Sequence, residues 1–142
     1  MPPDLQSPEI QAFAMGFPTT LLHAGVSILI LFLAASLYVL LTPHKEVRLI
    51  REGNAAAALS LGGVLVGLAA PLALSLNSST SVVEVAIWGV STVMVQLLVF
   101  RLVDLLLRGL PQRIQDGEVS AAALLVGAKL ATALILSAAV AT

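Results

Sequence analysis

The sequence predicts an all-α fold, an integral membrane four-helix bundle made of two tandem helical hairpins. Three observations predict it: the composition, four long apolar runs, and a correspondence between the two halves of the chain. Of 142 residues, 58% are hydrophobic and only 11% are charged, and the mean hydropathy is +1.02. A soluble domain carries about 25% charged residues. One small core cannot hide so much apolar surface, so we expect lipid to solvate it.

The four apolar runs are each close to the roughly 20 residues that a spanning helix needs. They cover residues 19–42, 55–76, 82–107 and 119–141. Strands are not expected, because the runs are continuous and show no alternation of apolar and polar residues. In lipid, a helix also satisfies its own backbone hydrogen bonds. The sequence therefore predicts a membrane domain over residues 19–142.

The segment before the first span, residues 1–18, is expected to be a tail with a short helix. Ser7 is placed to cap it, and Pro8 suits the first helical position. Apolar residues then recur at i, i+3, i+4 and i+7, namely Ile10, Phe13, Ala14 and Phe17. This face suits either the outer membrane surface or the end of the bundle, and both interpretations stay open. Without Lys or Arg, the segment does not resemble a cleaved signal and is expected to be retained.

A shift of 64 residues aligns the two halves of the membrane domain without gaps. Gly25-Val26-Ser27 falls on Gly89-Val90-Ser91, and Ile50-REG falls on Ile114-QDG. We therefore expect a duplication, with repeat one over residues 19–78 and repeat two over residues 82–142. Each repeat has two helices, so both copies enter the membrane in the same orientation. The pseudo-twofold axis of such a bundle should run along the membrane normal.

The second and fourth spans are expected to pack most closely. Small residues recur along them at helical spacing: Ala58, Gly62, Gly63, Gly67, Ala123, Gly127 and Ala131. Such residues let helix backbones approach in lipid, where no hydrophobic effect drives helices together. Packing within the bundle and contacts between subunits both remain open for them.

Basic residues gather in two connectors, which fixes the expected orientation. The first connector holds Lys45, Arg48 and Arg51, and the second holds Arg108 and Arg113. The N-terminal tail, the loop near residues 75–84 and the C-terminal end hold none. By the positive-inside rule, we expect a multi-pass membrane protein with the basic loops in the cytoplasm and both termini on the outer side.

These basic side chains also suggest partners. Lys45, Arg48, Arg51 and Arg113 are expected to meet lipid headgroups or a cytosolic or periplasmic protein. The partners expected are the lipid bilayer and other copies of the chain in a homo-oligomer. No nucleic acid partner is expected.

A cap motif precedes the second span. Gly53 and Asn54 stand before a run of alanines, and asparagine is a good N-cap. In the second half Gly117 is followed by Glu118, which takes the asparagine position. The residues Gly53, Asn54 and Gly117 are therefore expected to form helix-cap motifs before the second and fourth spans.

Two hairpins whose second helix opens on I-x-x-G-N-x-A-A-A resemble the bacterial inner-membrane family called domain of unknown function 350. The motif is complete once, as Ile50-REGNAAAA, and is altered in the second half to Ile114-QDGEVSAAA. The resemblance covers roughly residues 20–140. It implies a four-helix inner-membrane protein with no established activity, and it supplies no catalytic residues.

One charged residue stands in the middle of the fourth span. About ten helical residues precede Lys129, or about 15 Å, half the thickness of a hydrocarbon core. An ammonium there costs about 2.5–3.5 kcal/mol on insertion scales, so it needs a partner, water or a lost proton. Gln96 of the third span lies at a similar depth, and we expect the two to form an intramembrane polar site. Binding an anion, relaying a proton and joining two helices or subunits are open roles.

Two further sets of polar residues lie near the membrane edges. Arg101, Asp104 and Arg108 are spaced to form an ion ladder at the inner edge, either fixing the depth of the helix or acting as a gate or lipid-phosphate site. His23 and Glu84 fall near the outer interface. If they pair, the histidine would titrate near physiological pH.

Metal, cofactor and enzyme chemistry find no support in the sequence. There is no cysteine, and two distant histidines, His23 and His44, do not make a zinc site. No catalytic motif is present, so no enzyme activity, metal or cofactor is expected. The sequence suggests a small oligomeric ion or proton channel, or a transporter-like bundle, with its polar site at Lys129. The alternative is a non-conducting scaffold or anchor that recruits envelope partners through the basic cytoplasmic loops.

Overall fold

The computed structural model describes residues 7–42 and 45–141, which form six helices and, within these ranges, no strand. They are α1 (Pro8–Leu41), α2 (Glu46–Arg51), α3 (Ala55–Ser78), α4 (Val82–Leu106), α5 (Leu110–Gln115) and α6 (Val119–Val140). The predicted all-helical fold is confirmed. Residues 1–6 of the expected tail, together with His44, lie outside the described residues.

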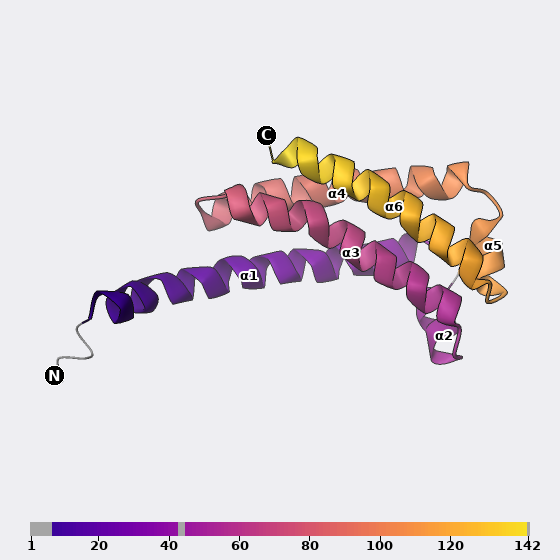
Figure 1. The fold of residues 1–142 in the computed structure, drawn as a ribbon, viewed down its shortest axis with the longest axis horizontal. Coiled ribbons are helices and arrows are strands. Elements are labelled where there is room, and N and C mark those ends of the chain that lie inside the picture. Colours follow the sequence, from indigo (N-terminus) through magenta and orange to yellow (C-terminus); the bar gives the residue numbers. More distant parts are fainter. Residues whose placement is uncertain (1–6, 43–44, 142) are drawn as a thin grey trace.

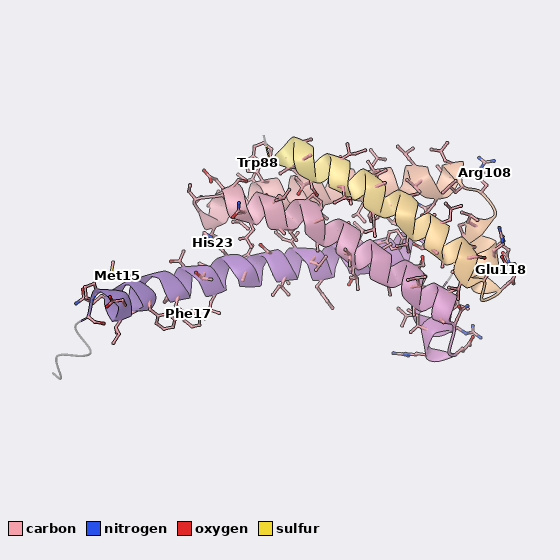
Figure 2. The ribbon with its side chains drawn as sticks, viewed as in Figure 1. Met15, Phe17, His23, Trp88, Arg108 and Glu118 are labelled. Carbon is pink, nitrogen blue, oxygen red and sulfur yellow. The ribbon has the colours of Figure 1, made fainter. Side chains whose placement is uncertain are left out.

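Four of these helices, α1, α3, α4 and α6, are long and apolar enough to cross a membrane. Side chains project outward from these helices along their length (Figure 2). Many of the exposed ones are large and apolar, for example Phe32, Val66, Leu98 and Ile135. Surface of this kind belongs in a lipid bilayer, where acyl chains solvate it. The short helices α2 and α5 lie together at one end of the bundle (Figure 1).

Helix α1 differs from the expectation of a short helix before residue 19 followed by a separate span. It runs without interruption for 34 residues, through Pro18, and its N-terminal part extends alone beyond the other helices (Figure 1). Ser7 caps it, because its Oγ accepts a hydrogen bond from Ile10 N at 3.3 Å. A proline removes one backbone hydrogen bond, which is too small a loss to end a helix that continues on both sides. Phe13 and Phe17 stack on each other, exposed, and do not pack on the bundle end.

The most extensive packing between helices joins α3 to α6, which confirms the expected close pair. A Cβ at Gly63 would lie 2.6 Å from the side chain of Val126 on α6. A Cβ at Gly67 would lie 2.5 Å from Cζ of Phe100 on α4. These two glycines therefore allow close approach within the bundle. The expected stripe of small residues on α6 does not take part in this packing within the bundle, because Ala123, Gly127 and Ala131 are exposed.

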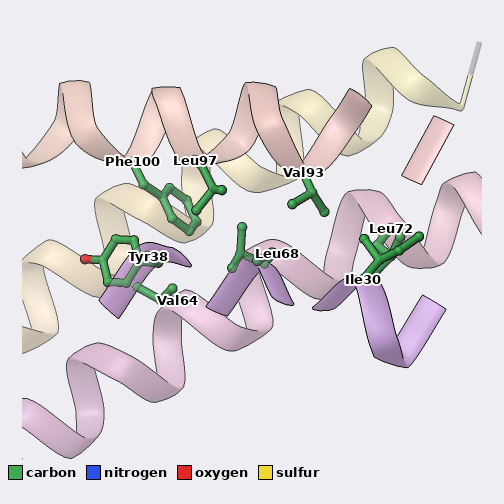
Figure 3. Packing of buried hydrophobic residues seen from close by; sticks show 9 residues of the cluster. Ile30, Tyr38, Val64, Leu68, Leu72, Val93, Leu97 and Phe100 are labelled. Atoms are coloured by element: carbon green, nitrogen blue, oxygen red, sulfur yellow. The ribbon is translucent and has the colours of Figure 1, made fainter. Parts of the chain in front are cut away.

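Buried apolar side chains form two clusters. The larger one joins α1, α3 and α4 in the middle of the bundle (Figure 3). It contains Ile30, Ala34, Tyr38, Val64, Leu68, Leu72, Val93, Leu97 and Phe100. The smaller one joins α3, α4, α5 and α6 near the two short helices, and contains Ala56, Ala57, Val103, Ile114, Ala121, Ala122 and Leu125.

Helix bounds near the connectors recur with the spacing that the sequence shift predicts. Helices α2 and α5 begin 64 residues apart, and so do α3 and α6. Gly53 and Gly117 both have positive φ, +89° and +86°, a conformation that glycine adopts without steric cost. The buried faces do not correspond, however: Leu65 is exposed, whereas Lys129 at the matching position is fully buried. The duplication itself stays a prediction.

The cap motif also links the start of α3 to the end of α5. Asn54 Oδ1 accepts a hydrogen bond from Ala57 N at 3.0 Å and so caps α3. Its Nδ2 donates to the carbonyl oxygens of Ile114 and Gln115 at 3.0 and 3.1 Å, at the end of α5. Glu118 precedes α6 in the same way but makes no cap hydrogen bond through its side chain.

Candidate functional site: a buried ion pair between three helices

The candidate site is built around Lys129 of α6, whose side chain is 0% exposed. Its Nζ lies 2.9 Å from Asp104 Oδ1 of α4. The same ammonium donates a hydrogen bond to the hydroxyl of Tyr38 on α1. Three membrane-spanning helices therefore meet at one charged group.

The position of Lys129 along α6 explains this contact. It lies ten residues after the start of α6, about 15 Å along the axis, whereas Asp104 lies only two residues before the end of α4. Lys129 and Asp104 nevertheless lie at the same depth, because α5 separates the two helices in the chain and α6 begins beyond the end of α4 (Figure 1). A helical side chain also leans toward the N-terminus of its own helix. The lysine therefore points toward the end that holds α2 and α5.

Aromatic rings enclose the ammonium. Lys129 Nζ lies 4.7 Å from the ring centroid of Tyr38 and 5.5 Å from that of Phe100. The two rings meet edge to face, with centroids 6.4 Å apart. Both distances suit a cation–π interaction, which strengthens when the cation is removed from water. The rings thus stabilise the charge and cover it at the same time.

Two more charged residues complete the site. Arg101 Nη1 lies 3.8 Å from Asp104 Oδ2, and the Asp104 side chain is only 10% exposed. Glu46 of α2 is fully buried and interacts electrostatically with Lys129 and Tyr38. Two basic and two acidic side chains balance each other in formal charge. Such a balance is what makes burial of charge tolerable in a low-dielectric region.

The expected partner of Lys129 is not its partner in the structure. Gln96 is fully buried on α4, and neither atom of its amide has a hydrogen-bond partner among the described residues. It lies eight residues before Asp104, about 12 Å along the axis. The ring of Phe100 comes from the turn of α4 between them. The lysine reaches Asp104 and Tyr38 because its side chain extends the opposite way.

The inner-edge ladder forms only in part. Arg101 approaches Asp104, but the closer cation to that carboxylate is Lys129. Arg108 lies beyond the end of α4, exposed, and forms no ion pair with Asp104 in the described part of the chain (Figure 2). The loss of helical geometry after α4 explains this, because the i, i+4 spacing brings side chains together only within a helix.

The outer residues His23 and Glu84 are not brought together in the described structure. Glu84 Oε2 instead accepts hydrogen bonds from Thr80 N at 2.7 Å and Thr80 Oγ1 at 3.1 Å. Ser81 Oγ accepts one from Glu84 N at 3.2 Å. A serine cap followed by glutamate three residues later is the pattern of a capping box. Glu84 thus stabilises the start of α4.

The basic residues of the two connectors all lie at the end with α2 and α5. Arg48 Nε lies 3.0 Å from Glu52 Oε1, and Arg113 forms an ion pair with Glu118. Lys45 and Arg51 are exposed. Among residues 7–42 and 45–141, no three His, Cys, Asp or Glu side chains gather to hold a metal.

Two members of the site were missed by sequence reasoning: Tyr38 and Glu46. The signal that could have found Tyr38 is its depth, because it lies three residues before the end of α1, as Asp104 lies two before the end of α4. Counting residues inward from the basic connectors would have placed Tyr38 and Asp104 at the same depth in the membrane. Glu46 carries no such signal, since its burial depends on how α2 folds against α3.

Comparison with known proteins agrees with these observations. A family model described as Domain of Unknown Function (DUF350) matches residues 12–140. The chain is similar to the UPF0719 inner membrane protein YjfL of Escherichia coli K12, with 35% identity over 97 residues, 68% of this chain and 72% of that protein. The same protein of Escherichia coli O157:H7 matches to the same extent. No solved structure matches.

Proposed function

The chain belongs to the family described as Domain of Unknown Function 350, and on that premise we propose that it conducts protons across the inner membrane. As a multi-pass membrane protein it has four helices able to span the bilayer. The observation that carries the proposal is the buried cluster of Lys129, Asp104 and Tyr38. These three groups would be the ones that take up and release protons.

The cluster supports this role because it is costly as a purely structural feature. Each buried ion loses several kcal/mol of hydration, and a buried ion pair often stabilises a protein less than apolar residues of similar volume. In a membrane helix an ionisable residue is therefore a candidate functional group by default. Lys129 is 0% exposed, and protein groups of three helices surround its charge.

Protons suit the site better than larger ions do. An ammonium, a carboxylate and a phenol each exchange protons, and hydrogen-bonded contacts such as that from Lys129 to Tyr38 allow transfer without a wide aqueous pore. Glu46 is the first residue of α2 and extends the cluster toward the end of the bundle that holds α2 and α5. On the other side, Gln96, whose amide has no hydrogen-bond partner in the described part of the chain, offers the next buried polar group along α4.

The proposal includes an orientation. The end that holds α2 and α5 carries five basic residues, Lys45, Arg48, Arg51, Arg108 and Arg113. The positive-inside rule then places this end in the cytoplasm and both termini in the periplasm. The chain has no native cysteine, so single cysteines at Arg113 and Ser79 report sidedness cleanly. A membrane-impermeant maleimide should label Ser79→Cys in intact cells and Arg113→Cys only after lysis; the reverse pattern would overturn the orientation.

We also propose that the working unit is a homo-oligomer. A single four-helix bundle has little room for a conducting path, and the exposed small residues Ala123, Gly127 and Ala131 offer a face on which two helices can approach. Chemical cross-linking in native membranes should give discrete multiples of the chain. Recovery of the single chain alone under these conditions would contradict the oligomer.

Proton flux in liposomes tests the function. Purified protein is reconstituted with a pH-sensitive dye inside the vesicles, and a membrane potential is applied. Wild type should acidify or alkalinise the lumen faster than empty vesicles do, and Lys129→Met/Asp104→Leu should lose this flux. Arg108→Gln, which removes an exposed charge outside the cluster, should retain it. Flux equal to that of empty vesicles would reject conduction, and full flux in the double variant would reject this site.

A non-conducting scaffold is the second candidate. It is favoured by the full enclosure of Lys129 behind Tyr38 and Phe100, because a closed site can simply hold three helices together. The exposed basic residues of α2 and α5 would then recruit envelope partners. In that case wild type gives no flux, while neutralising Lys45, Arg48 and Arg51 together lowers the recovery of a cross-linked partner from membranes.

A further inference from the structure

An apolar groove on the lipid-facing side of the bundle runs between α1 and α3 and ends at α2. It is lined on α1 by Phe32, Ala35 and Leu40, on α2 by Val47, and on α3 by Leu61 and Leu65. From Phe32 to Leu40 the groove follows α1 for about 12 Å. One leaflet of the hydrocarbon core is about 15 Å thick. The groove therefore spans most of one leaflet, on the side of α2.

Basic side chains stand at the α2 end of this groove. Val47 lines the groove, and Arg51 lies four residues later in the same helix, so both share one face of α2. Arg48 is already paired with Glu52 at 3.0 Å. Arg51 and Lys45 are exposed and form no ion pair within the described residues. Arg51 therefore shares the face of α2 that lines the groove, and its charge is not neutralised by an ion pair among the described residues.

The two basic connectors, around α2 and around α5, differ in net charge. Around α2, three basic residues face one exposed acidic residue, Glu52, because Glu46 is buried. Around α5, Arg108 and Arg113 are balanced by Asp116 and Glu118. The α2 region thus has an excess of positive charge, and the α5 region has none. An anionic headgroup is attracted to the first region only.

We propose that the groove binds one anionic phospholipid, with an acyl chain along α1 and α3 and the phosphate at Arg51 and Lys45. The groove supplies apolar contact over the length of a leaflet, and the basic residues supply the complementary charge where the headgroup lies. Basic residues next to a membrane helix attract anionic lipid in this way. This site is independent of proton conduction.

Lipid retention measured by native mass spectrometry tests the site. The protein is reconstituted in vesicles of phosphatidylcholine with a minor fraction of phosphatidylglycerol, then released in mild detergent. Wild type should retain phosphatidylglycerol in preference to phosphatidylcholine. Arg51→Gln should lower this preference about fivefold, the effect of one basic residue near an anionic headgroup. Arg108→Gln, an equal loss of charge at the α5 end, should not change it.

Filling the groove gives a second, independent test. Ala35→Phe places a ring in the groove without changing charge and should displace the lipid. Ala73→Phe is the matched control, because Ala73 lines a second α1–α3 groove in the other half of the membrane. Equal losses for Arg51→Gln and Arg108→Gln, or retention unaffected by Ala35→Phe, would overturn the proposal. So would a dimer that Ala35→Phe dissociates, which would assign the groove to a second copy of the chain.

Discussion

Removing one member of the Lys129–Asp104 pair should cost far more stability than removing both. Loss of one partner leaves an uncompensated buried charge, which typically costs about 3–5 kcal/mol. Replacing both by apolar residues of similar size is often neutral or stabilising by about 1–4 kcal/mol. The variants are Lys129→Met, Asp104→Leu and the double substitution.

The structure also predicts which of the two single variants loses more stability. Without Lys129, the carboxylate of Asp104 retains Arg101, 3.8 Å away, and is itself 10% exposed. Without Asp104, the ammonium of Lys129 is 0% exposed and no longer has a carboxylate within ion-pair distance among the described residues; it retains the Tyr38 hydroxyl, the rings of Tyr38 and Phe100 and the nearby charge of Glu46. Asp104→Leu should therefore lie near the upper end of this range, and Lys129→Met near the lower end.

Reversible unfolding in mixed detergent micelles, followed by circular dichroism, gives the four free energies of the cycle. The coupling energy between the two sites should be several kcal/mol, because the double variant recovers what each single variant loses. Two single variants that each stay within about 0.5 kcal/mol of wild type would refute the reasoning. A double variant whose loss equals the sum of the single losses would also refute it.

Two further predictions concern packing and capping. Gly67→Ala should lose about 1–3 kcal/mol, because its Cβ would lie 2.5 Å from Phe100 Cζ. Gly25→Ala on α1, with no atom within 4 Å of the new Cβ, should be neutral or gain up to about 1 kcal/mol. Thermal unfolding in detergent compares the two variants, and equal midpoints would contradict the contact assigned to Gly67. Asn54→Ala should lose about 1–2 kcal/mol, because it removes the cap of α3 and both bonds to α5. Glu118→Ala, at the matching position without a cap bond, should lose under about 0.5 kcal/mol in the same assay, and a similar loss in both variants would argue against the bridging role.

Sequence reasoning was sufficient for the four apolar spans and for the closest packing pair, but not for the short helices α2 and α5 in the connectors. Continuous apolar runs of this length leave few alternatives in lipid, so the number of spans and the close approach of α3 and α6 followed from the pattern. The boundary at residue 18 did not follow, because a proline weakens a helix without fixing where it ends. The structure continues α1 through Pro18.

The partners of Lys129 were harder to predict, because they depend on where one helix begins relative to the end of another. From spacing alone, Asp104 belongs with Arg101 and Arg108 on its own helix, whereas α5 shifts α6 so that the lysine reaches it. The burial of Glu46 follows from the same tertiary arrangement. Local sequence predicts local contacts well, and it carries little information on contacts between segments far apart in the chain.

The length of α1 has a consequence for the membrane that surrounds it. Thirty-four residues measure about 51 Å, against a hydrocarbon thickness of about 30 Å. Spanning helices incline by at most about 40°, an angle at which roughly 26 residues fill the core. At least about eight residues of α1 must then reside outside the hydrocarbon core, and a thicker bilayer would draw them inward. The inclination of this helix should thus respond to bilayer thickness more than that of its shorter neighbours.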